Sequence, residues 1–107
     1  MTKTTEHCPA DRYLYDFGPC RDFAQVDTCQ DASYFGIWAC PTRRVIFSYC
    51  EGDCTTTECD TDEEFRAEIH RIRDFANSVG TFRGIDPGLS PAKVEAWTAI
   101  GLAELLH

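Results

Sequence analysis

Three cysteines lie within ten residues of this chain, in the spacing C-x3-C-x4-C that runs from Cys50 to Cys59. Thiolates at such close spacing are ligands that zinc accepts in a tetrahedral structural site. A tight loop at residues 51–53 would set Cys50 and Cys54 opposite each other across a hairpin, and a neighbouring strand or the His7-Cys8 pair would supply a fourth ligand. The usual zinc modules use paired C-x2-C hooks, and this chain has none. Zinc is therefore an alternative to free thiols, and its ligands would be Cys40, Cys50, Cys54 and Cys59.

The chain has seven cysteines in all, an odd number, and its first residues lack the apolar core of a signal peptide. We therefore expect a cytoplasmic protein with reduced thiols. Cys20 is the best candidate for a reactive thiol, because it follows Gly18-Pro19 and precedes Arg21, whose cation would favour the thiolate. A thiol enzyme or redox sensor that uses Cys20 is a second alternative. No G-x-S-x-G, Walker or H-E-x-x-H motif is present, and we expect a protein that is not an enzyme and holds no cofactor.

The strongest chemical signal is a concentration of negative charge. Residues 51–64 hold seven carboxylates and no lysine or arginine, in a chain whose formal net charge is −8. Such a stretch attracts basic protein surfaces and repels nucleic acid and membranes. A helix start and a turn explain five of the acids, and a purely solubilising face is the simpler interpretation of the whole. As a binding surface, the stretch would contact a basic protein partner through Glu51, Asp53, Glu58, Asp60, Asp62 and Glu63, with Tyr49 as an aromatic anchor.

The residues before position 60 are arranged as strands. They are rich in aromatic, β-branched and threonine residues, and turn signals interrupt them at short intervals. This pattern predicts antiparallel strands at residues 12–17, 23–27, 34–40, 44–50 and 54–59. The clearest pair, 34–40 with 44–50, is joined by a tight turn at residues 41–43. A meander of about four to five strands is therefore expected.

After residue 60 the apolar period changes to that of a helix. Thr61 fits an N-cap, and Glu64 would reach back to it to complete a capping box. The pattern predicts a helix of about 17 residues that stops at Gly80. Its apolar stripe is formed by Phe65, Ile69, Ile72, Ala76 and Val79, and is widened by Phe75.

Ser90 and Pro91 predict the start of a second, shorter helix, which Gly101 would end. Its inner face would be Val94, Trp97 and Ile100. The expected fold is α+β: an antiparallel sheet with the long helix packed on one face and a short C-terminal helix. Residues 1–107 fit a single domain, of which we expect residues 1–11 to be mobile. No apolar run has the length of a membrane helix.

Several short strings within Val26 to Ile72 resemble one group of known proteins. They are Asp27-Thr28, Gln30-Asp31-Ala32, Tyr34, Gly36, Trp38-Ala39, Ser48-Tyr49, Glu51-Gly52-Asp53, Cys59-Asp60-Thr61 and Glu63-Glu64-Phe65, and residues 84–88 are similar too. The group is the small accessory proteins of proteobacterial plasmids, phages and integrative elements, and the resemblance covers somewhat more than half of the chain. In size and charge the chain also resembles inhibitors of host defence, such as anti-CRISPR and antirestriction proteins. This resemblance implies a protein that occupies the basic, nucleic-acid-binding surface of a defence complex, without itself binding nucleic acid or membrane.

Overall fold

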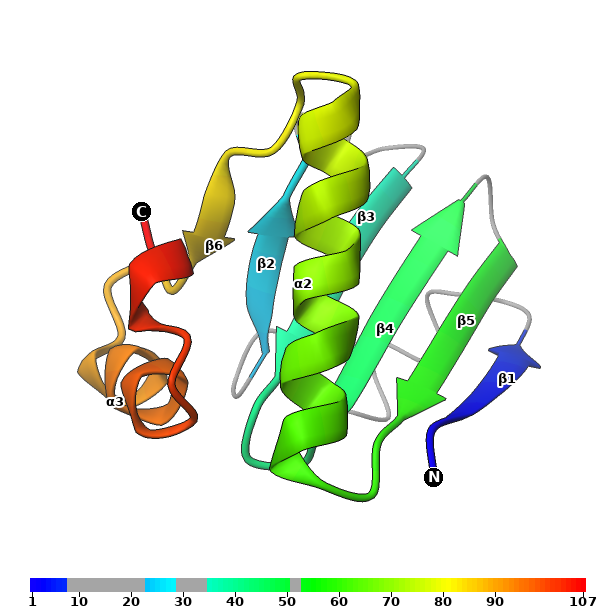
Figure 1. Cartoon of the computed structure of the whole chain (residues 1–107), viewed down its shortest axis with the longest axis horizontal. Coiled ribbons are helices and arrows are strands. Elements are labelled where there is room, and N and C mark those ends of the chain that lie inside the picture. The colour runs from blue at the N-terminus through cyan, green and yellow to red at the C-terminus, as the bar shows by residue number, and fades with distance from the viewer. Residues whose placement is uncertain (8–22, 29–34, 51–52) are drawn as a thin grey trace.

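The computed structural model describes residues 1–7, 23–28, 35–50 and 53–107. In these residues six strands form one antiparallel sheet, in the order β1-β5-β4-β3-β2-β6, accompanied by two α-helices and a short 3-10 helix (Figure 1). The α+β class is confirmed, as are the long helix and the short C-terminal helix. The sheet is slightly larger than the four to five strands that the sequence predicts.

Four consecutive strands form the predicted meander. They are β2 (Ala24–Asp27), β3 (Phe35–Cys40), β4 (Val45–Cys50) and β5 (Asp53–Glu58), and each lies within one residue of its predicted bounds. β3 and β4 pair from Phe35 opposite Cys50 to Cys40 opposite Val45. The turn between them ends at Arg44, which adopts a left-handed φ of 57°. The strand predicted at residues 12–17 lies outside the described residues.

The two edge strands were not predicted. β1 (Lys3–His7) lies within residues 1–11, which were expected to be mobile, and pairs with β5 along its whole length. β6 (Gly84–Asp86) pairs with β2 at the opposite edge. Leu106 adds a parallel bridge to Ile85, and the His107 amide donates a hydrogen bond of 3.0 Å to the Ile85 carbonyl. The last residues of the chain therefore cover the outer edge of β6.

The long helix α2 (Asp62–Ser78) begins where predicted, because the Thr61 hydroxyl accepts a hydrogen bond of 3.1 Å from the Glu64 amide. The capping box is only half formed. The Glu64 carboxylate accepts from the Asp60 amide, at 3.4 Å, and not from the amide of Thr61.

Only part of the predicted apolar stripe of α2 is buried. Phe65, Ile69 and Ala76 face the core, but Phe75 and Val79 are exposed, so the stripe prediction is wrong for these two residues. Figure 1 shows the reason. The helix lies towards the β2 side of the sheet, and its flank on the β5 side faces open space.

The second helix, α3 (Pro91–Ala99), begins at the Ser90 cap, and the 3-10 helix η1 (Ala103–Leu105) follows it. Trp97 is completely buried, with its ring centroid 5.8 Å from that of Phe65 on α2. Val94 is exposed, which corrects its predicted place on the inner face. Gly101, at a φ of 86°, turns the chain after this helix. Arg66 of α2 also donates a hydrogen bond of 3.1 Å to the Ile100 carbonyl, and Leu102 and Leu105 share the core cluster with Phe65. The C-terminal segment is therefore fixed to α2 by several contacts, of which Trp97 is the largest side chain.

The core has two parts, one on each face of the sheet. On the helix side, alternate residues such as Val26, Ile37 and Ile46 pack against Phe65 and Ile69. On the opposite side Phe23, Cys40, Val45, Phe47 and Cys54 form a second cluster, with Trp38 and Tyr49 packed against it. Among the described residues, neither helix has the length and apolar character needed to cross a lipid bilayer.

Candidate partner-binding surfaces

Four of the predicted contact residues remain close together, where β5 leads into α2. Glu58 is the last residue of β5, and Asp60, Asp62 and Glu63 follow it into the first turn of the helix. All four side chains are exposed. We call this set of four residues the acidic end. Glu51, the first residue of the predicted surface, lies outside the described residues.

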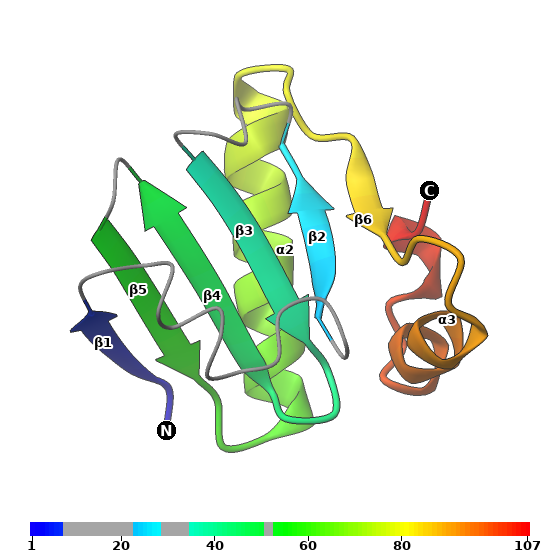
Figure 2. The same ribbon diagram turned by 180° about the vertical axis from the view of Figure 1, so that it is seen from behind.

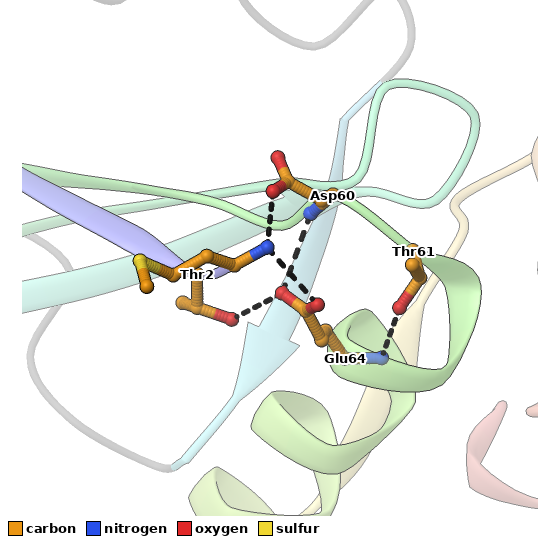
Figure 3. A network of polar contacts seen from close by, with 5 residues as sticks. Thr2, Asp60, Thr61 and Glu64 are labelled. Atoms are coloured by element: carbon orange, nitrogen blue, oxygen red, sulfur yellow. Dashed lines mark hydrogen bonds and ion pairs between the residues drawn. The ribbon is translucent and has the colours of Figure 1, made fainter.

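Two cations of the chain itself approach the acidic end. Figure 3 shows the first, the amine of Met1, which pairs with Asp60 and lies 3.2 Å from Glu64 Oε2. The Asp60 carboxylate raises the pKa of this amine. The second cation is Arg44, whose Nη1 lies 3.3 Å from Asp62 Oδ1. The turn before β4 and the first residues of the chain thus neutralise part of the charge that is concentrated in the sequence.

The network in Figure 3 also joins β1 to the start of α2. The Thr2 hydroxyl donates a hydrogen bond of 2.9 Å to Glu64 Oε1. This bond, together with the pairing to the Met1 amine, holds the pKa of Glu64 below its usual value. A carboxylate with a lowered pKa contributes its stabilisation above its unfolded pKa and loses it as the pH falls through the folded value. The junction is therefore firmest at neutral pH.

Glu58 and Glu63 form no ion pair within the described residues. In the part of the chain that the structure describes, no lysine, arginine or histidine lies within ion-pair distance of either carboxylate. Lys3 is the Cα partner of Glu58 in the β1–β5 ladder. A cation of a partner protein would therefore gain the most electrostatic energy by pairing with these two glutamates of the acidic end.

Asp53 does not belong to the same surface. It begins β5 opposite Cys50, whereas Glu58 ends the strand opposite Val45. Because side chains alternate along a strand, residues five positions apart point to opposite faces. Val45 belongs to the cluster on the side away from the helix, so Glu58 points to that side and Asp53 to the helix side. The prediction that these acids form one small surface is wrong.

Tyr49, the predicted anchor, packs on the sheet itself. It is half-buried on the side away from α2, 6.4 Å from the ring of Phe47. Its ring covers Gly36 so closely that a Cβ at Gly36 would lie 2.7 Å from Tyr49 Cε1. A larger residue at position 36 would therefore have to displace the Tyr49 ring.

The four cysteines of the alternative zinc site do not converge. Cys40 and Cys54 belong to the cluster on the side away from the helix, where they lie opposite Val45 and Tyr49 of β4. These positions are four residues apart, or about 13 Å along the strand. Cys59 lies in the core on the helix side, and Cys50 is exposed at the end of β4. Among the described residues no three histidine, cysteine or acidic side chains gather as a metal site would need. Cys20 lies outside the described residues.

The burial of these thiols predicts their relative reactivity. We expect Cys50 to react with iodoacetamide at least about tenfold faster than Cys40, Cys54 or Cys59, because only its thiol is exposed. Burial also raises the pKa of the Cys59 thiol and so disfavours the reactive thiolate. Peptide mass spectrometry over a time course would measure the four rates, with the urea-unfolded chain as the control in which they converge. Fast labelling of Cys40 or Cys54 in the folded protein would contradict the buried positions of these residues in the sheet. If adding zinc slowed the labelling of all four cysteines, including Cys50, the zinc site would be favoured.

One surface feature was not predicted. A groove of about 230 Å³ lies between the flank of α2 and the helix-side face of the sheet. Ile37, Ile46 and Ile72 contribute apolar atoms to its lining, Phe75 and Val79 border it, and Ser48, Thr57, Glu68 and Arg71 are its polar residues. The apolar stripe of α2 in the sequence is wider than the part of the helix that contacts the sheet. Because the whole stripe was assigned to the core, the groove was not predicted.

No family model matches the chain, and no curated protein or solved structure shows significant similarity to it.

Proposed function

We propose that this chain is a non-enzymatic interaction protein that binds a basic surface of a partner protein through the acidic end. The observation that carries the proposal is the simultaneous exposure of Glu58, Asp60, Asp62 and Glu63 at one junction of the fold. Two of these carboxylates, Glu58 and Glu63, form no ion pair with a described residue. The four residues lie on the connection between β5 and α2, so the backbone that carries them is already folded, and only the exposed side chains lose rotamer freedom on binding.

The two internal ion pairs do not prevent binding. Both are on the surface, and exposed ion pairs contribute only about 0–1 kcal/mol each. An arginine of a partner would therefore replace Arg44 or the Met1 amine at little cost. Each replacement also frees a cation of this chain to return to water.

The proposed partner is a nucleic-acid-binding protein of a host defence complex in the cytoplasm. The resemblance to accessory proteins of mobile elements supports this class, and so does the net charge of −8. DNA presents about one negative charge per 1.7 Å of helix axis. A compact set of carboxylates would compete with DNA for the same lysines and arginines, and the protein would inhibit its target by occupying them.

Charge reversal at Glu58 and Glu63 tests this proposal. Glu58→Lys combined with Glu63→Lys should abolish retention of the partner in a pull-down from cells that carry a CRISPR or restriction system. The matched control is Glu95→Lys with Glu104→Lys, which changes the net charge equally on α3 and η1. Retained proteins are identified by mass spectrometry, and those captured by the parent chain should elute with added DNA or at about 0.5 M salt. Equal capture by the parent and by the Glu58/Glu63 variant would refute the proposal.

A further inference from the structure

Among the described residues, no helix covers the half of the helix-side face that β5 and β1 form. Figures 1 and 2, taken from opposite sides, agree that α2 lies beside β2 and β3 and that β5 and β1 extend beyond it. On the uncovered half, alternate positions of β4, β5 and β1 carry the small hydroxyl residues Ser48, Thr55, Thr57 and Thr4. Asp53, at the start of β5, is a charged residue on the same face. The Thr4 and Thr57 hydroxyls lie 3.3 Å apart. In the described part of the chain, no second helix covers this half.

The flank of α2 beside the uncovered half carries two large apolar side chains that are exposed to solvent. Phe75 is 73% exposed and Val79 is 60% exposed, and both line the 230 Å³ groove. A cavity of about 150 Å³ accepts a benzene ring, so this groove has room for a phenylalanine side chain. One surface thus carries both a projecting aromatic residue and a groove that would receive one.

We infer that this face is the interface of a homodimer, in which α2 of each copy lies on the uncovered half of the other copy's sheet. A two-fold axis brings the same surface of both copies together, which requires that surface to be self-complementary. A half-covered sheet with one helix meets this requirement: the helix that one copy lacks is the helix that the other provides. Phe75 of each copy enters the groove of its partner copy.

Charge complementarity identifies a second copy as the occupant. Arg71 projects from the exposed flank of α2, where its side chain is 68% exposed and pairs with Glu68 Oε2 at 2.9 Å. An exposed pair of this kind contributes little to stability, so Arg71 can exchange it for a carboxylate of a second copy. Asp53 lies on the uncovered half, at the start of β5 and on the helix side. The dimer brings the Arg71 of one copy to the Asp53 of the other, twice by symmetry. Glu58 points to the other side of the sheet, so the inference is independent of the proposed function.

The mass in solution tests the dimer. Sedimentation equilibrium from micromolar to millimolar concentration should give twice the chain mass of 12.1 kDa. Phe75→Asp should raise the dimer dissociation constant at least about thirtyfold, as for a central hot spot of an interface. Leu89→Asp is the matched control, because Leu89 is fully exposed away from the groove, and this variant should dimerise like the parent. Circular dichroism would confirm that both variants are folded.

A charge exchange tests the orientation. Arg71→Asp and Asp53→Arg should each weaken the homodimer, because each places like charges at both symmetric contacts. Mixing the two variants should restore a dimer, since both contacts of the mixed species then join opposite charges. Native mass spectrometry distinguishes the mixed dimer from either homodimer.

Three results would overturn the inference. They are a single species of 12.1 kDa at all concentrations, a parent-like dimer for Phe75→Asp, and the absence of a mixed dimer. A monomer whose Phe75 becomes protected only when a cationic amphipathic peptide or a small apolar ligand is added would assign the groove to that ligand instead. The Glu58/Glu63 variant should still dimerise, so its failure to bind a partner cannot be confused with loss of the dimer.

Discussion

Trp97→Ala is expected to lower the free energy of unfolding by about 3–5 kcal/mol, the usual cost of removing a buried tryptophan side chain. Trp97 is fully buried and packs on Phe65, and it is the largest side chain through which the C-terminal segment contacts α2. Its loss would leave a cavity between two elements rather than within one. Because the total free energy of unfolding of a small domain is about 5–15 kcal/mol, the variant would be marginally stable. Urea unfolding followed by far-ultraviolet circular dichroism measures the change.

Trp97→Phe separates the ring from its polar atom. The Trp97 Nε1 is buried and has no hydrogen-bond partner among the described residues, and such a donor loses its water without compensation. Phenylalanine keeps most of the packing and removes the donor, so its cost should stay below about 1.5 kcal/mol. Leu89→Ala, at a fully exposed site, should leave the unfolding midpoint unchanged. If Trp97→Ala costs no more than Trp97→Phe, the proposed packing of the C-terminal segment is wrong.

Gly84→Ala is expected to cost about 2–4 kcal/mol, from a strained backbone and a steric clash together. Gly84 has a φ of 110°, which only glycine adopts readily. An added Cβ would also lie 2.8 Å from the Leu105 carbonyl oxygen and 3.1 Å from the Cβ of His107. The C-terminal residues would have to leave the edge of β6, and the hydrogen bond from the His107 amide to the Ile85 carbonyl would be lost.

Gly88→Ala is the matched control for this variant. Gly88 also has a positive φ, 62°, but a Cβ there would meet no atom within 4 Å. Its cost should be about 1–2 kcal/mol, the strain of the left-handed backbone alone. Equilibrium unfolding gives both values, and hydrogen exchange at the His107 amide reports the edge contact directly. If Gly84→Ala and Gly88→Ala lowered the free energy of unfolding equally, the Leu105 carbonyl would have to move away from the added Cβ at no cost, and the predicted clash would be wrong.

The parts of the fold that could be predicted are those specified by neighbouring residues. Thr61 and the helical apolar period predict the start and the length of α2. Alternating apolar residues and turn signals predict β2 to β5. β1 could not be found in this way, because its partner β5 lies about fifty residues later in the sequence. β6 is three residues long, too short for a periodic signal. Both edge strands exist because of pairing, not because of local preference.

The five predicted contact acids that the structure describes, Asp53, Glu58, Asp60, Asp62 and Glu63, are exposed, but their grouping was not predicted correctly. Asp53 and Glu58 are an odd number of residues apart, so alternation alone places them on opposite faces of β5. That signal was available in the sequence. The cations near the acidic end could not be anticipated, because Arg44 and Met1 come from other parts of the chain. Phe75 and Val79 were misplaced for a similar reason, since helical period does not say how much of a sheet the helix covers.

The position of β1 has a consequence for the order of folding during synthesis. The ribosome makes this strand well before its partner, Asp53–Glu58, which emerges only after about fifty further residues. At a synthesis rate of about 5–20 residues per second, β1 remains unpaired for several seconds. Lysine and threonine make up most of its sequence, so the waiting strand remains well hydrated and exposes little that would aggregate. The meander from β2 to β5 closes through neighbouring pairs, and β1 then completes the sheet as its last strand on that edge.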